Sequence, residues 1–311
     1  MSKALVTGGA GFIGSSLVRG LLQRGWQVRV LDDFSSGKRG NLEELLPRLD
    51  LVTGSVCDAA LCRRAAANCD VIFHLAADVS VPRSMIDPEQ THRTNVDGTY
   101  NCLVAAREAG VRRFVFTSSS AVYGDDPAQP KIEAMKLDPI SPYGGSKAIG
   151  ELYATVFSRC FGVSTVCLRY FNVFGPRQDP QSQYAAAIPA FVSRMLRGER
   201  PTVYGDGEQS RDFTFVENVV QANLAAADAR VDGPLVANIA CGTSITVNRI
   251  IRVLNELLGT RLDPQYEPPR AGDIKHSWAD ISLARKVLGY EPTVDFEAGL
   301  RQAIGWYREN L

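Results

Sequence analysis

The chain has 311 residues, of which 45% are hydrophobic, and its 34 basic residues balance its 34 acidic residues. This length suits one large domain or two closely joined domains with a sizeable core. The balanced charge favours neither a nucleic acid nor a membrane surface as a partner. No apolar stretch approaches the ~20 residues of a membrane span, and residues 1–8 indicate a strand rather than a signal peptide.

Seven cysteines occur without a C-x-x-C pair, and the odd number argues against a disulfide framework or a zinc knuckle. Reduced thiols in a cytoplasmic protein are the simpler interpretation. The only histidines, His74, His92 and His276, are scattered along the sequence, so we expect no metal site.

Short apolar runs alternate with helical spacing through the first half of the chain. Strands are predicted at residues 3–7, 28–31, 51–53, 71–75, 114–118 and 163–168, and helices at 12–24 and near 58–67, 91–109 and 143–161. Strands that are apolar on both sides and alternate with helices predict an α/β fold, a Rossmann-type doubly wound parallel sheet. Such a sheet binds its ligand at the carboxyl ends of the strands.

A glycine-rich turn, Gly8, Gly11 and Gly14, joins the first strand to the first helix. Glycines there allow close approach of a pyrophosphate, which the N–H groups of the helix start can bind. Glycines also mark ordinary turns, but the second strand runs into Asp32 and Asp33. An acid at this place binds the adenosine ribose and repels a 2′-phosphate, so the pattern favours NAD over NADP.

Tyr143 and Lys147 lie four residues apart on a predicted helix and therefore share one face. A nearby ammonium favours the phenolate, which suits tyrosine as a general base. Ser119 follows a predicted strand, where its hydroxyl could share the proton of a substrate oxygen. Taken alone, Tyr143 and Lys147 could be an exposed pair on a helix, and Ser119 could belong to a polar turn. Together they indicate a catalytic site.

Frequent prolines shorten the elements after about residue 170. We therefore expect an NAD-binding Rossmann domain over residues 1–170 and a smaller C-terminal substrate-binding region over residues 171–311. Segments of the second region could return to the main sheet.

Further motifs stand at residues 73–77, 95–99, 168–176, 205–207, 211–213 and 270–273. With these motifs the chain, from residue 3 to about residue 300, resembles the extended short-chain dehydrogenase/reductase family that acts on nucleotide sugars. Within that family the chain is most similar to UDP-sugar 4-epimerases of the UDP-glucose and UDP-N-acetylglucosamine type, and residues 177–189 are especially similar to the branch that handles UDP-N-acetylglucosamine. The resemblance implies an isomerase that epimerises a UDP-hexose through a transient 4-keto sugar and keeps its NAD through turnover.

The resemblance also implies the roles of individual residues. Ser119, Tyr143 and Lys147 would be catalytic. The cofactor NAD would be bound by Gly8, Gly11, Phe12, Ile13, Gly14, Asp32, Asp33, Phe34, Ser35, Ser36, Gly37, Ser55, Val56, Leu75, Ala76, Ala77, Asn95, Thr117, Tyr143, Lys147, Tyr170 and Val173. The UDP-sugar would be bound by Val81, Arg83, Ser119, Ser120, Tyr143, Asn172, Ala186, Ala187, Ile188, Val203, Tyr204, Arg211, Arg270, Asp273 and Ser277.

Several positions depart from related patterns. Ser55 replaces the aspartate that usually meets the adenine, and Ser120 and Ala121 replace the acidic pair of 4,6-dehydratases. Asn172 and Asp179 stand where glucuronate epimerases tend to have threonine and arginine. A serine at position 277 leaves room beside the sugar's C2, which favours an N-acetylated substrate, whereas Val79 replaces a glycine of the N-acetyl-preferring branch.

Alternatives remain open at this level. They are a UDP-glucuronate 4-epimerase, another nucleotide-sugar oxidoreductase or dehydratase on the same fold, and a cofactor-binding regulatory protein without activity. The expected partners are a UDP-sugar and, by resemblance, a second copy of the chain, packed through the helices near residues 92–109 and 143–161. Neither a nucleic acid nor a membrane is expected as a partner.

Overall fold

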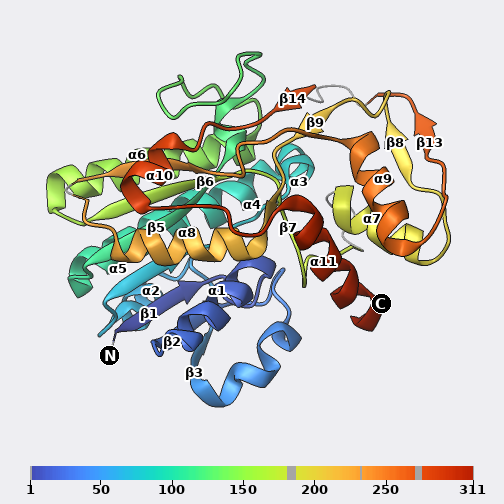
Figure 1. The fold of residues 1–311 in the computed structure, drawn as a ribbon. Coiled ribbons are helices and arrows are strands. Elements are labelled where there is room, and N and C mark those ends of the chain that lie inside the picture. Colours follow the sequence, from blue (N-terminus) through green and yellow to red (C-terminus); the bar gives the residue numbers. More distant parts are fainter. Residues whose placement is uncertain (1, 181–186, 232, 270–274, 311) are drawn as a thin grey trace.

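The computed structural model describes residues 2–180, 187–231, 233–269 and 275–310 (Figure 1). Its largest sheet has seven strands in the order β11-β6-β5-β4-β1-β2-β3, and every neighbouring pair is parallel. The predicted Rossmann-type fold class is therefore confirmed. The strands are β1 (Lys3–Thr7), β2 (Gln27–Asp32), β3 (Leu49–Thr53), β4 (Val71–His74), β5 (Arg113–Ser119), β6 (Thr165–Tyr170) and β11 (Leu235–Ile239).

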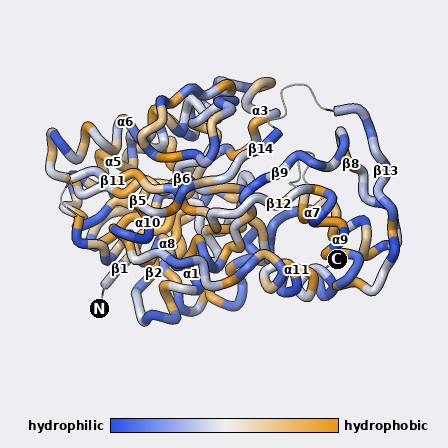
Figure 2. Tube along the Cα trace, turned by 45° about the horizontal axis from the view of Figure 1, so that its top comes forward, coloured by the Kyte–Doolittle hydropathy of each residue, from blue (hydrophilic) through white to orange (hydrophobic). Residues whose placement is uncertain are grey.

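Helices cover both faces of this sheet, because successive strand residues point to opposite sides. In β1, Ala4 and Val6 join the apolar cluster under α1 and α8, whereas Leu5 joins the cluster under α2, α5 and α6. Apolar residues accordingly concentrate along the central strands (Figure 2). The elements on the two faces and their connections are α1 (Phe12–Gln23), η1 (Arg39–Arg48), α2 (Ala59–Ala66), α3 (Val81–Ile86), α4 (Pro88–His92), η2 (Arg93–Asp97), α5 (Gly98–Ala109), η3 (Ser120–Tyr123), α6 (Pro142–Phe161), α8 (Val216–Asp228) and α10 (Ser282–Leu288).

A smaller half lies beside the sheet and has its own apolar cluster, which includes Phe174, Phe215 and Phe296. It is built from short pieces that come from distant parts of the chain. These pieces are β7 (Val173–Phe174), α7 (Ala187–Leu196), β8 (Thr202–Tyr204), β9 (Ser210–Arg211), β10 (Thr214–Phe215), β12 (Ile245–Thr246), α9 (Val247–Leu258), β13 (Gln265–Glu267), β14 (His276–Ser277) and α11 (Phe296–Asn310).

The six predicted strands are present with small differences at their ends, whereas β11 and α8 were not predicted. β11 pairs with β6, so a segment from the second half of the chain completes the main sheet. The division of the chain at residue 170 stays a prediction. Within the described ranges, no helix is long and apolar enough to cross a membrane.

Candidate active site

The glycine turn packs tightly against the end of β4. Gly8 has a φ of +68°, and its N–H donates to the carbonyl of Leu31 at 2.9 Å. A Cβ on Gly8 would lie 2.7 Å from the nitrogen of Ala76, and a Cβ on Gly14 would lie 2.1 Å from the carbonyl oxygen of Gly8. Both distances are too short for any side chain, so the turn requires glycine at these places. α1 then begins at Phe12 without a side-chain cap, as an anion site at a helix start requires.

The ends of β1 and β4 are joined by Thr7, a residue with no predicted role. Its Oγ1 accepts hydrogen bonds from the N–H groups of Leu75 and Ala76, both at 3.2 Å, and lies 2.7 Å from Nδ1 of His74. Burial lowers the pKa of His74 to about 3. His74 is therefore neutral and structural, and it fixes the backbone that faces the glycine turn.

Asp32 lies at the end of β2 and joins the glycine turn to the loop that follows β2. Its carboxylate accepts from the N–H groups of Ala10 and Phe34, both at 2.8 Å. Burial raises the pKa of Asp32, and these two hydrogen bonds oppose that rise. A carboxylate offers about four acceptor positions, so two bonds leave room for ribose hydroxyls.

The three predicted catalytic residues meet where β5 ends and α6 begins. Ser119 is the last residue of β5, and Tyr143 lies in the first turn of α6. Lys147 is buried and donates from Nζ to the carbonyl of Thr117 at 2.9 Å, and Nζ lies 5.8 Å from the centre of the Tyr143 ring. Burial raises the pKa of Tyr143, a hydrogen bond with Ser119 opposes the rise, and burial lowers the pKa of Lys147 to about 8.

A chain of hydrogen bonds connects the backbone of Tyr143 to Ser146, Asn95 and Asp78. Asn95 lies in the short π-helix η2. Its Nδ2 donates to the carbonyl of Asp78 at 2.9 Å and to Oγ of Ser146 at 3.0 Å. Oγ of Ser146 donates to the carbonyl of Tyr143 at 2.7 Å. Asn95 was predicted to border the cofactor, whereas Ser146 was not predicted at all. Both residues fix the start of α6.

Two predicted substrate residues are neighbours in the small sheet β12-β9-β14. Arg211 in β9 is the register partner of Ser277 in β14. The neighbouring Asp212 is fully buried and accepts backbone N–H bonds from the 241–243 loop and Ala279 at 2.9–3.3 Å. Burial raises the pKa of Asp212 to about 6 despite these bonds. Asp212 was not predicted, and it fixes the strand that carries Arg211.

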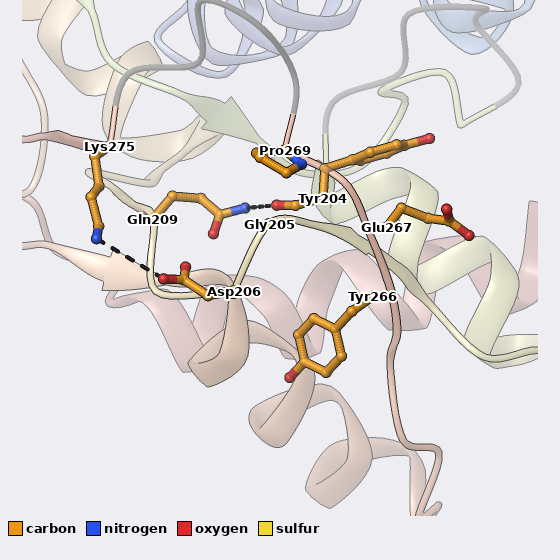
Figure 3. A pocket seen from close by; sticks show the side chains of 8 residues that line it. All are labelled: Tyr204, Gly205, Asp206, Gln209, Tyr266, Glu267, Pro269 and Lys275. Carbon is orange, nitrogen blue, oxygen red and sulfur yellow. Dashed lines mark hydrogen bonds and ion pairs between the residues drawn. The ribbon is translucent and has the colours of Figure 1, made fainter.

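A cavity of about 740 Å³ opens beyond this sheet, at the ends of the paired strands β8 and β13 and the loops that follow them. Figure 3 shows Tyr204 and Pro269 close together on one side of it, and the Asp206 and Lys275 side chains facing each other at 4.0 Å. Its lining residues are Tyr204, Gly205, Asp206, Gln209, Tyr266, Glu267, Pro269 and Lys275. Of these, only Tyr204 was predicted.

The other predicted cofactor residues lie at the carboxyl edge of the main sheet. Most of them follow its strands or lie near the strand ends: Asp33, Phe34, Ser35, Ser36 and Gly37 after β2, Ser55 and Val56 after β3, Leu75, Ala76 and Ala77 after β4, Thr117 in β5 and Tyr170 in β6. Val173 lies in β7, which belongs to a separate two-stranded sheet with β10. The predicted substrate residues are more dispersed, over α3 (Val81, Arg83), η3 (Ser120), α7 (Ala187, Ile188), β8 (Val203) and the β6–β7 connection (Asn172). Val203 and Ile188 are buried in the apolar cluster of the smaller half, and Ala186, Arg270 and Asp273 lie outside the described residues.

Comparison with known proteins identifies the family of this chain. The model of the NAD dependent epimerase/dehydratase family matches residues 4–240. The chain belongs to this family. The predicted resemblance is thus confirmed, and NAD is the cofactor that the family uses.

Individual epimerases are similar over the whole chain. The solved UDP-N-acetylglucosamine 4-epimerase from Methanobrevibacter ruminantium M1, in complex with UDP-N-acetylmuramic acid, is 40% identical with a TM-score of 0.96, covering 100% of this chain and 99% of that one. The UDP-glucose 4-epimerase of Mycolicibacterium smegmatis is 38% identical over 310 residues, 98% of each protein. The UDP-glucuronic acid 4-epimerase from Bacillus cereus, solved with UDP-glucuronic acid and NAD, is 31% identical with a TM-score of 0.90, covering 99% of this chain and 100% of that one.

The residues of this epimerase-family protein fit NAD. The turn at Gly8 and Gly14 has no room for side chains, α1 begins without a side-chain cap, and Asp32 keeps acceptor positions for a ribose. NAD, when bound, accepts a hydride from the substrate and returns it. Thr7, Ser146 and Asp212 were not predicted as site residues, although Asp212 lies in the 211–213 motif, because the sequence does not show which groups their side chains contact.

Proposed function

We propose that this protein is a UDP-sugar 4-epimerase that acts on UDP-glucose and UDP-N-acetylglucosamine. One observation carries the proposal: the buried Lys147 ammonium, the Tyr143 phenol and the Ser119 hydroxyl meet at the end of β5. This arrangement suits removal and return of a hydroxyl proton beside a nicotinamide. The oxidation of C4 and its later reduction cancel, so a complete turnover leaves no net change in oxidation state and the cofactor can stay bound.

Tyr143 takes the proton from the 4-hydroxyl as C4 loses its hydride, and Ser119 shares that hydrogen bond. The Lys147 ammonium stabilises the phenolate form of Tyr143, while its bond to the Thr117 carbonyl fixes its place. The resulting 4-keto sugar turns over and regains the hydride on its other face. Tyr143 then returns the proton to the oxygen, which completes the inversion at C4.

The diphosphate of the UDP is held by Arg211 with Asn172 beside it, because guanidinium groups pair well with phosphate. Asn172 donates to the carbonyl of Asp212, the residue next to Arg211, at 3.3 Å. The cavity beyond them receives the uracil, since Tyr204 and Pro269 offer apolar surface while Asp206 and Glu267 would repel phosphate. Arg270 and Asp273 remain proposed ligands by resemblance.

Ser277 admits the N-acetyl group. Its small, buried side chain lies in register beside Arg211 and therefore near the sugar end of the diphosphate. A tyrosine there would fill the space beside C2. We expect Ser277→Tyr to abolish conversion of UDP-N-acetylglucosamine and to retain conversion of UDP-glucose, and the second activity of the same variant serves as the control.

The test is product analysis with UDP-glucose, UDP-N-acetylglucosamine and UDP-glucuronate in parallel. We expect C4 epimers of the first two and no net release of NADH. Conversion of UDP-glucuronate alone would favour the glucuronate alternative. Against that alternative, Asp179 forms an ion pair with Lys38 at 3.0 Å and offers no positive charge for a carboxylate.

A homodimer is part of the proposal. Apolar side chains of α5 and α6 lie exposed side by side, and Tyr100 contacts Tyr153 edge to face at 5.5 Å. The exposed set is Tyr100, Ile149, Leu152, Tyr153 and Val156. A second copy would cover this face in a four-helix packing. A cytoplasmic location is likewise proposed, on the free cysteines.

A further inference from the structure

A buried polar network lies directly behind the catalytic residues. Arg169 of β6 makes two parallel hydrogen bonds to Glu151 of α6, at 2.8 and 2.7 Å, and both side chains are about 95% buried. Ser118 of β5 donates from Oγ to the same carboxylate at 2.5 Å. Arg169 also donates to Oη of Tyr123, which in turn donates to Asn238 of β11. This hydrogen-bond network, centred on the ion pair, thus joins β5, β6 and β11 to α6.

Each end of this network adjoins a catalytic group. Ser118 lies between Thr117, whose carbonyl holds Lys147, and Ser119. Glu151 lies one helical turn after Lys147 on α6. The bond between Ser118 and Glu151 therefore links the strand that carries Ser119 directly to the helix that carries Tyr143 and Lys147.

Apolar packing alone does not fix how α6 sits along β5. Gly150 lies against Phe116, where a Cβ would be 2.3 Å from the ring. This contact sets how closely the helix approaches the strand, but it has no direction along the strand. Two parallel bonds between a guanidinium and a carboxylate do have direction. Together with the bond from Lys147 to the Thr117 carbonyl, the bond from Ser118 to Glu151, whose carboxylate Arg169 orients, sets the offset between β5 and α6.

We propose that Glu151 and Arg169 are positioning residues that fix the separation between the Ser119 hydroxyl and the Tyr143 phenol. This inference rests on the proposed epimerase function. Neither residue touches the substrate. Both hold the two proton-sharing groups at the spacing that the chemical step needs, and a small error in that spacing lowers kcat more than substrate binding.

The test compares Glu151→Gln with a matched control, Arg113→Met, at the opposite end of β5. Arg113 is also a buried arginine, and it donates to Oγ of Ser164 and to the carbonyl of Ala229. We expect Glu151→Gln to lower kcat per NAD-loaded protein about 10–100-fold, with KM for the UDP-sugar within about threefold. Arg113→Met lowers the melting temperature comparably and leaves kcat within about twofold, because the active site lies at the other end of the strand.

A double variant, Glu151→Leu with Arg169→Met, separates positioning from stability. Removing both charges leaves no unpaired buried ion, so the melting temperature recovers relative to Glu151→Gln. We expect kcat to remain low, because leucine offers no acceptor for the Ser118 hydroxyl and the link between β5 and α6 is lost. A kcat near the wild-type value in either Glu151 variant would overturn the inference alone. Absence of conversion by the wild-type protein would overturn the proposed function, and the inference with it.

Discussion

The glycine turn gives the sharpest quantitative test of the cofactor site. In Gly14→Ala, the new methyl group would lie 2.1 Å from the carbonyl oxygen of Gly8 and 2.9 Å from Cα of Gly9. Both neighbours are backbone atoms and cannot rotate away. Relief requires about 1 Å of backbone movement, and overpacking of this kind costs about 1–3 kcal/mol. For a protein of this size that corresponds to a fall in melting temperature of about 1.5–5 °C.

The same movement displaces the N–H groups at the start of α1, which would bind the pyrophosphate. A misplacement of 1 Å costs on the order of 100-fold where geometry is exacting, so we expect NAD affinity to fall by about that factor. The assay is the NAD content of the purified protein after acid release, together with the dissociation constant by calorimetry. Gly305→Ala is the control, because a Cβ there meets only open space and alanine favours the helix by about 1 kcal/mol.

The outcome that refutes this reasoning is specific. If Gly14→Ala keeps wild-type NAD content and melting temperature, the turn yields easily and its close packing does not create the cofactor site. A fall in melting temperature with unchanged NAD affinity would instead show that the packing of Gly14 is structural only.

Three further predictions follow from the site. Tyr143→Phe removes only a hydroxyl, so we expect epimerisation to fall at least about 100-fold with an unchanged melting temperature; substantial remaining activity would contradict the assignment of the base. Asp32→Asn removes the charge that repels a 2′-phosphate, so competition binding should show NADP gaining on NAD. Lys147→Met should stabilise the NAD-free protein at pH 7, because burial holds the pKa of Lys147 at about 8 in the folded protein, below the ordinary lysine value of 10.5. Between about pH 8 and 10.5 the unfolded wild-type chain binds more protons than the folded one, so the stability of the wild-type protein rises with pH. The stability advantage of Lys147→Met, measured by thermal unfolding, should therefore shrink over this range.

The placement of the proposed cofactor residues in the fold could be predicted because their signals are local in sequence. The glycine turn, Asp32, and the pair Tyr143 and Lys147 each lie within one strand–turn–helix unit. Periodicity and spacing therefore place them at the carboxyl edge of a parallel sheet. β11 carried no such signal, since it is a five-residue strand between loops, and its place beside β6 depends on contacts across some 70 residues of sequence.

The roles of Glu151 and Asp212 could not be predicted, because their partners, like those of β11, are distant along the chain. Glu151 resembles any acid on a helix until Arg169 lies opposite it, and Asp212 resembles a surface acid until four N–H groups surround it. Both are buried charges, which are unfavourable unless their partners are in place. Those partners come from strands and loops distant along the chain, so neither composition nor periodicity reveals them.

The two halves of the site are held in ways that suit the proposed reaction. Ser119, Tyr143 and Lys147 are fixed to the main sheet through β5 and α6, and Arg211 is fixed to the small sheet through the buried carboxylate of Asp212. Neither attachment has to move when a 4-keto sugar presents its other face. The bond between sugar and diphosphate is then the element that rotates, so the enzyme needs open space beside C2 rather than a conformational change. We therefore expect the small residue at position 277 to affect which sugars have room to turn as well as which sugars bind.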